Sequence, residues 1–509
     1  MAASAHGGDA GSQSWAAGKV GAKSLLFSDS YRTVAYVNGL FCLYLALGML
    51  PAMAVDIIDG NDDWRGFLSA LFLVGSLSGA VILANRGQFQ PFSLRIGFLL
   101  VTTLWLSTSL VSSLPFLFGA RDISFTDAAF EAVSGLTTTG ATVLSGLDDM
   151  PRGLLLWRST TQWLGGIGIV AMGLLVFPFL RIGGMQFFRM ESSERSDKPV
   201  ARIQTFAVSL IGLYCLLTLV CMVLYAVGGM TWFDALNHAM TTISTAGFST
   251  RDSSFAQFGD LILVTAIIFM LIGAMPFTAF FLLVLNNDYK RAMDSQIAAL
   301  LLIILVLMVP AFASASSHGS LSATDALIHS LFNVVSIVTT TGYATTDYTQ
   351  WGTLSAGVFL VAMFVGGCAG STAGGFKTYR LIILFQTLRV SVRELVYPNG
   401  VFPVYYNNKR ISPEALQSVT TFFTAYIAIL FLFTLLLAAT GLDLVTAFTG
   451  TLATLSNVGP ALGDIIGPAG HFGPLSDTAK WLLIMLMFLG RLEIMTVLVI
   501  ASPVFWRGN

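Results

Sequence analysis

Long apolar stretches constrain the fold of this chain more than any other feature of its sequence. Most of them hold about 20 residues or more, and they lie near 34–55, 66–84, 96–118, 154–180, 204–228, 260–285, 297–315, 353–367, 378–388, 418–440 and 478–503. A helix needs about 20 apolar residues to cross the hydrocarbon core of a bilayer, and continuous apolar runs favour helices over strands. Only 10% of the residues are charged and the mean hydropathy is +0.78, which excludes a string of soluble domains. The sequence predicts an all-α polytopic membrane protein.

Four shorter apolar segments lie between the long ones, near residues 126–139, 233–246, 324–341 and 443–458. At roughly a dozen residues each, they are too short to cross a bilayer as helices. Irregular backbone is tolerated at membrane depth only where it is buried in protein or lines a water-filled cavity. We therefore expect these segments to be re-entrant, each entering the membrane from one side and returning to it.

The charged residues are distributed unevenly over this topology. If the short segments enter from outside, 19 of the 26 Lys and Arg residues lie on the inner side, as expected for cytoplasmic loops. Most carboxylates then lie on the outer side, where an acidic vestibule concentrates cations. A charge bias that only sets topology accounts for the basic half of this pattern, but it does not require the acidic half.

The four short segments share a pattern in which each begins at an aspartate and ends near a glycine. They read DAAFEAVSGLTTTGAT (127–142), DALNHAMTTISTAGFS (234–249), DALIHSLFNVVSIVTTTGYA (325–344) and DLVTAFTGTLATLSNVGPA (443–461). The aspartates, which we expect to be helix N-caps rather than direct ion ligands, are Asp127, Asp234, Asp325 and Asp443. Asp-to-Gly separations of 13, 13, 17 and 16 residues indicate that the last two helices begin one turn earlier. Units recurring at about 100 residues favour a pseudo-fourfold assembly around one pore.

Four half-helices aimed at a common axis suit the passage of cations. Their C-terminal ends carry partial negative charge, and the extended residues that follow can turn backbone carbonyls inward to replace a cation's hydration shell. Glycine leaves the bore open and adopts the backbone angles that inward carbonyls require. The residues expected to line this selectivity filter are Thr138, Thr139, Gly140, Thr245, Ala246, Gly247, Thr340, Thr341, Gly342, Asn457, Val458 and Gly459.

Seven motifs taken together are highly specific. They are TTTGAT (137–142), STAGFS (244–249), TTTGYATT (339–346), SNVGPA (456–461), WLGGIGI (163–169), GGCAGSTAGGFK (366–377) and GRLEI (490–494). Through them the chain resembles the Trk/Ktr/HKT superfamily of potassium transporters from roughly residue 30 to its C-terminus. The extra helix pair at about 34–84, which precedes the first repeat, favours the bacterial TrkH-like pore-forming branch.

The resemblance implies a function as well as a fold. It implies potassium uptake across the bacterial cytoplasmic (inner) membrane by a homodimer, with both termini in the cytoplasm and a TrkA-like nucleotide-binding regulatory subunit as partner. It implies K+ as the transported ion, with no tightly bound organic cofactor and no enzymatic activity. Plant relatives that prefer sodium carry serine at the position of Gly140, so the resemblance favours potassium.

The predicted domains follow from the four units. We expect a polar cytoplasmic tail (1–30) and an extra transmembrane helix pair (31–90), followed by four repeats, at 91–200, 201–292, 293–412 and 413–509. Each repeat contains a span, a half-helix, a filter segment and a second span. The third also contains a gating loop.

The second span of the third repeat is interrupted by the glycine-rich stretch 366–376, which runs into Lys377. Each glycine costs about 1 kcal/mol in a helix interior, so the stretch is expected to break the helix. Close packing of small residues is the alternative, and it accounts better for Gly165, Gly166 and Gly168 in the first repeat. In the family, this stretch is a gating loop. The residues that we assign to gating are Gly366, Gly367, Gly370, Ser371, Thr372, Gly374, Gly375, Lys377 and Arg491.

Arg491 lies near the middle of the last predicted span. A charge at that depth costs at least about 2.5–3.5 kcal/mol, so it should face a cavity or a partner. Aligning the second spans places it in register with Gly166, Ala274 and Gly367. An ion pair with Glu493 is the alternative, but residues two apart on a helix do not face each other. We therefore expect Arg491 to be a positive barrier in the ion path.

Two other classes of function are weighed against this one. A secondary transporter of an organic substrate would show two inverted halves, whereas the four units here run parallel. A membrane enzyme would need a cluster of reactive side chains in its spans, which contain almost none beyond Arg491 and Glu493. The chain has no GxxxxGK[ST] phosphate loop, so control by a nucleotide requires a partner.

Overall fold

The computed structural model describes residues 31–87, 93–119, 121–172, 199–286, 294–318 and 321–507. The predicted tail 1–30 lies outside these residues. The regular secondary structure of the described part is helical apart from one hairpin, in which β1 (Tyr405–Tyr406) pairs antiparallel with β2 (Lys409–Arg410). This agrees with the predicted all-α class.

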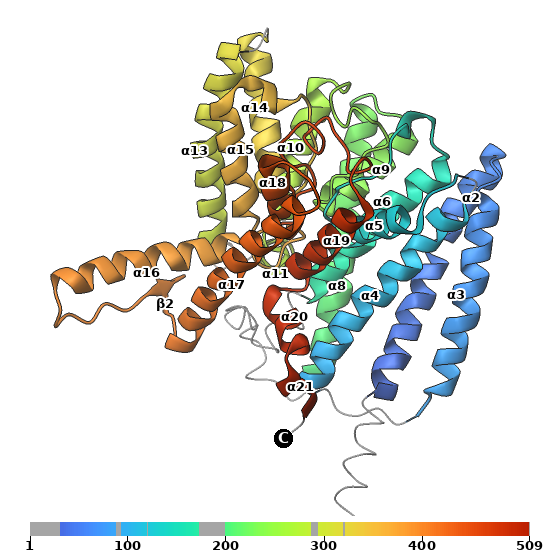
Figure 1. The fold of residues 1–509 in the computed structure, drawn as a ribbon, viewed down its shortest axis with the longest axis horizontal. Coiled ribbons are helices and arrows are strands. Elements are labelled where there is room, and N and C mark those ends of the chain that lie inside the picture. The colour runs from blue at the N-terminus through green and yellow to red at the C-terminus, as the bar shows by residue number, and fades with distance from the viewer. Residues whose placement is uncertain are drawn as a thin grey trace, which may run out of the picture.

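Most of the predicted spans are long apolar helices (Figure 1). Within the described residues, six helices are long and apolar enough to cross a membrane. They are Tyr31–Asp59, whose last part is α2 (Leu50–Asp59), α3 (Trp64–Ala84), α4 (Leu94–Phe118), α8 (Pro199–Val227), α13 (Ser295–His318) and α17 (Pro413–Ala438). Other elements of the described chain are α6 (Arg152–Ala171), α15 (Thr353–Val365), α16 (Thr378–Val396), α21 (Pro503–Arg507), η1 (Leu147–Asp149) and η5 (Tyr348–Trp351).

The four short segments each form a half-length helix followed by extended backbone. These helices are α5 (Phe125–Leu136), α9 (Trp232–Ile243), α14 (Ala323–Val338) and α18 (Leu444–Leu455). Each packs against the long helix that precedes it and the helix that follows it in the chain. Their packing brings the four glycine-containing segments to the centre of the molecule, as the contacts described below show.

The N-cap prediction is right for one aspartate and wrong for three. Asp443 caps α18, but the caps of α5, α9 and α14 are Ser124, Thr231 and Ser322. In those three helices the aspartate is the third helical residue, where it still favours the positive end of the helix. The hydroxyl residue three places earlier takes the cap because its oxygen accepts the aspartate's own N–H.

Counting from the true caps changes the predicted helix lengths. The cap-to-glycine separation is 16 residues in the first, second and fourth segments and 20 in the third. Accordingly α14 has 16 residues and the other three helices have 12 each. Four residues are about one helical turn. The extra turn therefore belongs to the third helix alone, and the prediction of an early start for the fourth was wrong.

Three second spans are broken, although the sequence predicted only one break. The expected break separates α15 from α16 at residues 366–377, and α16 leaves the bundle sideways (Figure 1). In addition, α10 (Asp260–Ala274) meets α11 (Phe277–Asn286) at 95°, and α19 (Asp477–Arg491) meets α20 (Ile494–Ala501) at 109°. Pro276 is the local signal for the first of these two bends, because proline cannot donate to the helix ladder. At the second, Glu493 has a positive φ of 63°.

The first repeat's glycines confirm the close-packing alternative at two of three positions. A side chain at Gly165 would lie 1.9 Å from the Leu136 carbonyl oxygen, and one at Gly166 would lie 2.7 Å from the Ser244 side chain. Gly490 of α19 approaches the Leu455 carbonyl in the same way, at 2.1 Å. No described residue comes within 4 Å of a Cβ added at Gly168, so close packing among these residues does not explain that glycine.

Candidate ion pathway

The four filter segments share one unusual backbone conformation. The residue two before each glycine has positive φ, at 53°, 47°, 58° and 54° for Thr138, Thr245, Thr340 and Asn457. Each glycine also has positive φ, between 79° and 96°, and the residue between them returns to negative φ. Positive φ in a β-branched residue such as threonine is a real outlier. Strain of this kind persists only where the surrounding structure enforces it, and it is concentrated at functional sites.

The four segments form a closed ring through their glycines. A Cβ atom at Gly140 would lie 2.1 Å from the Ala246 carbonyl oxygen, and one at Gly247 would lie 1.9 Å from that of Thr341. The series continues from Gly342 to Val458 at 2.1 Å and closes from Gly459 to Thr139 at 2.8 Å. Each glycine thus lies against the carbonyl just before the next segment's glycine, in chain order. The ring leaves no room for a side chain at the first three glycines, and the fit at Gly459 is less tight.

Hydroxyl groups brace two of the four segments from within. In the first, the hydroxyls of Thr137 and Thr139 are 2.8 Å apart, and Thr339 and Thr341 repeat this contact at 2.8 Å in the third. The second and fourth segments have Ala246 and Val458 before the glycine and cannot make the same pair. In the fourth, the Asn457 amide instead donates to the Thr139 hydroxyl and to the Met487 carbonyl.

Polar residues at equivalent places on three half-helices anchor the backbone that leaves the filter. Glu131, nine residues before its glycine, accepts from the Val143 N–H at 3.0 Å. Asn333, also nine residues before its glycine, accepts from the Thr345 N–H at 3.1 Å. His238 takes the same place in the second segment and bonds the Ser249 hydroxyl at 3.0 Å. These contacts fix the outer ends of the segments.

A buried ion pair ties the first two segments together. Arg158 donates to Glu131 at 2.7 Å, and both side chains are almost fully buried. The same guanidinium donates to the Ser249 carbonyl at 2.9 Å, across the boundary between the first and second segments. Arg158 lies within the apolar run near 154–180, and a charge in such a run was the available signal for burial.

A cavity opens above the ring, on the side to which the extended segments lead. All four filter glycines line it, together with residues of the outer loops such as Arg251, Asp252 and His471. Arg251 donates to Asp148 and Asp234, and these hydrogen bonds raise the pKa of its guanidinium. The loops around the mouth are therefore held by ion pairs.

The glycine-rich stretch 366–377 lies directly beneath the filter. Its Thr372 hydroxyl contacts the Thr245 hydroxyl at 3.1 Å, and the Gly374 N–H donates to the Thr340 hydroxyl at 2.7 Å. The Gly375 N–H donates to the Ser456 carbonyl at 2.7 Å. The stretch therefore contacts the second, third and fourth filter segments.

The break between α10 and α11 is matched to this stretch. The Ala274 carbonyl accepts from the Cys368 N–H at 2.9 Å, and the Phe277 N–H donates to the Gly370 carbonyl at 3.0 Å. Backbone groups freed by a broken helix at membrane depth need such partners. The loop and the bend therefore provide hydrogen-bond partners for each other's free backbone groups. This pairing explains why the second repeat is also broken.

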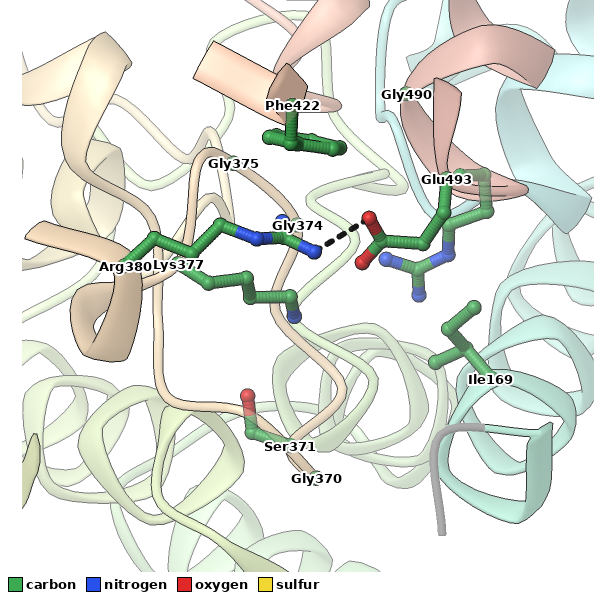
Figure 2. Close-up of a pocket in the computed structure, with 11 residues that line it drawn as sticks. Ile169, Gly370, Ser371, Gly374, Gly375, Lys377, Arg380, Phe422, Gly490 and Glu493 are labelled. Atoms are coloured by element: carbon green, nitrogen blue, oxygen red, sulfur yellow. Dashed lines mark hydrogen bonds and ion pairs between the residues drawn. The ribbon is translucent and has the colours of Figure 1, made fainter. Parts of the chain in front are cut away.

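Four charged side chains gather around the small cavity below the filter. Arg491 donates to the Thr372 carbonyl at 2.9 Å and lines this cavity with Lys377, Arg380 and Glu493. Figure 2 shows Glu493 paired with Arg380, at 2.6 Å. The Lys377 ammonium donates to the Ala373 carbonyl. Glu493 thus bonds to Arg380 in the first turn of α16. It does not pair with Arg491, which agrees with the expectation that residues two apart on a helix do not face each other.

The structure brings the predicted site residues into two layers. The twelve residues predicted to line a filter lie in the four segments that form the ring, and the loop residues assigned to gating lie immediately beneath it together with Arg491. Sequence reasoning missed four of the residues that hold these layers and the true partner of a fifth, Glu493; the four are Glu131, Arg158, Gln162 and Arg380. Each is a polar residue close to or within an apolar run, which is the signal that was available.

Comparisons with known proteins agree on one family. The chain matches the family TrkH, described as a cation transport protein, over residues 66–507. It is 40% identical over 470 residues to the Trk system potassium uptake protein TrkI of Halomonas elongata, covering 91% of this chain and 95% of the relative. It is 36% identical to TrkH of Vibrio parahaemolyticus, covering 94% and 100%. The crystal structure of the potassium transporter TrkH from Vibrio parahaemolyticus superimposes with a TM-score of 0.86, at 34% identity and with 94% and 100% coverage. The chain therefore belongs to the TrkH family of cation transport proteins, and it is a transporter rather than an enzyme.

Proposed function

We propose that this protein takes up potassium through the ring formed by its four filter segments. The observation that carries the proposal is the closed set of glycine-to-carbonyl contacts, in which four carbonyls and four glycines alternate around one centre. Backbone carbonyls contributed by four segments around one path can replace the hydration shell of a potassium ion. The relatives that it resembles are named as potassium uptake proteins.

We further propose that the ring is assembled from the four sequence repeats, each contributing three filter residues. The common backbone pattern of the four segments supports this assignment. The basic loops are proposed to face the cytoplasm of a bacterial inner membrane, together with both termini. A homodimer and a cytoplasmic nucleotide-binding subunit of the TrkA type complete the proposed assembly. The subunit is included because the relative TrkI is named as a protein of a Trk system.

The central experiment is growth rescue. A bacterium lacking its own potassium uptake systems should grow at low potassium when it expresses this chain with the cognate regulatory subunit. Rubidium, which serves as a tracer for potassium, should enter the same cells in a saturable way. Absence of both rescue and rubidium uptake, with the protein present in the membrane, would overturn the proposed function.

Control of the pore is proposed to reside in residues 366–377 and Arg491. The loop touches three filter segments from below, and the Arg491 guanidinium bonds the loop carbonyl of Thr372 while lining the cavity there. A fixed positive charge in a narrow path repels cations. Movement of the loop would remove the obstruction and break the hydrogen bond that holds the Arg491 guanidinium at Thr372.

Replacing Arg491 by alanine is expected to raise rubidium influx several-fold. The substitution removes both the positive barrier and the hydrogen bond to Thr372. It should also weaken the dependence of influx on the regulatory subunit. Influx per folded protein, measured with and without that subunit, checks the prediction. An Arg491→Ala variant with parental influx and parental dependence would contradict it.

A further inference from the structure

The second filter segment is held by a residue from another part of the chain. Its last residue before the glycine is Ala246, so the paired hydroxyls of the first and third segments are missing. Gln162 of α6 takes their place. Its amide nitrogen donates to the Ala246 carbonyl at 2.7 Å, and its amide oxygen accepts from the Phe248 N–H at 3.0 Å. The side chain therefore bridges across Gly247.

This bridge makes one of the four ring carbonyls different from the others. The carbonyls of Thr139, Ala246, Thr341 and Val458 occupy the same place in the ring. In the part of the chain that the structure describes, only the Ala246 carbonyl accepts a hydrogen bond from the protein. A carbonyl that already accepts an N–H rotates less freely and presents a weaker field to a cation.

Gln162 also stands out among the equivalent positions of the four second spans. The aligned motifs are QWLGG (162–166), MLIGA (270–274), MFVGG (363–367) and MFLGR (487–491). Gln162, Met270, Met363 and Met487 are all fully buried. Burying an amide is costly unless its polar atoms are hydrogen-bonded, whereas methionine fits the same place in three repeats. The glutamine is therefore best explained by its two bonds to the filter.

We propose that Gln162 is a positioning residue that sets ion selectivity by fixing the Ala246–Gly247–Phe248 backbone. Discrimination between K+ and Na+ depends on the spacing, number and field strength of the coordinating carbonyls. Because Gln162 fixes the backbone of the second filter segment, this segment resists moving inward around the smaller sodium ion. The inference rests on the proposed function, because it assigns Gln162 a role in that same filter.

The test replaces Gln162 by methionine, the residue at the equivalent position of the other three repeats. Gln162→Met keeps the volume and removes both hydrogen bonds, and it is expected to lower K+/Na+ selectivity about tenfold, equivalent to about 1.4 kcal/mol. Selectivity is measured as the ratio of the Na+ and K+ concentrations that halve rubidium uptake by the full transporter. This ratio does not depend on how much protein folds. Met363→Leu, a conservative change at the equivalent position of α15, should retain the parental ratio.

The outcomes separate this inference from the proposed function. If Gln162→Met yields no folded protein, Gln162→Asn keeps a buried amide that is one methylene too short to bridge both groups. The K+/Na+ selectivity of Gln162→Asn should fall about as far as that expected for Gln162→Met. A parental ratio in whichever variant folds overturns the inference alone. An unmodified chain without potassium-selective uptake overturns the proposed function, and this inference with it.

Discussion

Alanine in place of Gly140, Gly247 or Gly342 is expected to reduce rubidium uptake more than a hundredfold, while Gly459→Ala retains measurable transport. The reason is steric. An added Cβ would lie 1.9–2.1 Å from a neighbouring backbone carbonyl at the first three positions, and 2.8 Å from the Thr139 carbonyl at Gly459. Contacts that short force the backbone of the adjacent segment to move, and the ring has no flexible side chain that could yield instead.

Comparing the four glycine variants separates this steric overlap from the cost of backbone strain. All four have positive φ, where any non-glycine residue is strained by roughly 1–2 kcal/mol. Because that strain is common to the series, the difference between Gly459→Ala and the others reports the steric contact. Uptake should be divided by the amount of folded protein, measured by fluorescence-detected size-exclusion chromatography.

Gly168→Ala is the matched control for this series. Gly168 lies in α6, where no described residue comes within 4 Å of an added Cβ, and alanine favours a helix interior by about 1 kcal/mol over glycine. The control should therefore transport as the parent does. Equal loss in all four filter variants, or parental uptake in Gly342→Ala, would contradict the ring geometry.

The sequence was sufficient to predict the class of fold and to mark the four glycine-containing segments that the structure brings together. Helical spans follow from the lengths of the apolar runs, and the recurring glycines pointed to the segments that meet in the ring. The predicted caps failed because Asp127, Asp234 and Asp325 resemble caps by residue type, whereas a hydroxyl three places earlier accepts each aspartate's own N–H and starts the helix at that earlier residue. Local preference alone does not decide such a competition.

The supporting contacts could not be predicted from the sequence for a different reason. The bond between Gln162 and Ala246 and the pair between Arg380 and Glu493 join residues 84 and 113 positions apart. Such partners are known only when the packing of helices is known. The bend after Ala274 belongs to the same class, because its freed carbonyl is satisfied by a loop of the next repeat.

Breaking the buried pair between Arg380 and Glu493 is expected to destabilise the protein strongly. Arg380 lies in the first turn of α16 and Glu493 lies at the bend between α19 and α20, with side chains 1% and 6% exposed. The guanidinium also stacks over Phe422 at 3.7 Å. Removing one partner leaves the other charge buried and uncompensated, which costs about 3–5 kcal/mol. Arg380→Met and Glu493→Gln should each lower the Tm of the solubilised protein markedly.

The double variant tests whether the loss comes from the pair itself. Replacing both partners removes both buried charges, so Arg380→Met with Glu493→Gln should recover most of the Tm lost in either single variant. Methionine retains the apolar contact with Phe422, which keeps packing similar. Arg389→Met is the matched control, because Arg389 lies on the same helix over the ring of Phe385 but is exposed, and its Tm should stay close to the parent's. Additive losses in the double variant would show that Arg380 and Glu493 act separately, and that no ion pair joins α16 to the bend beneath the filter.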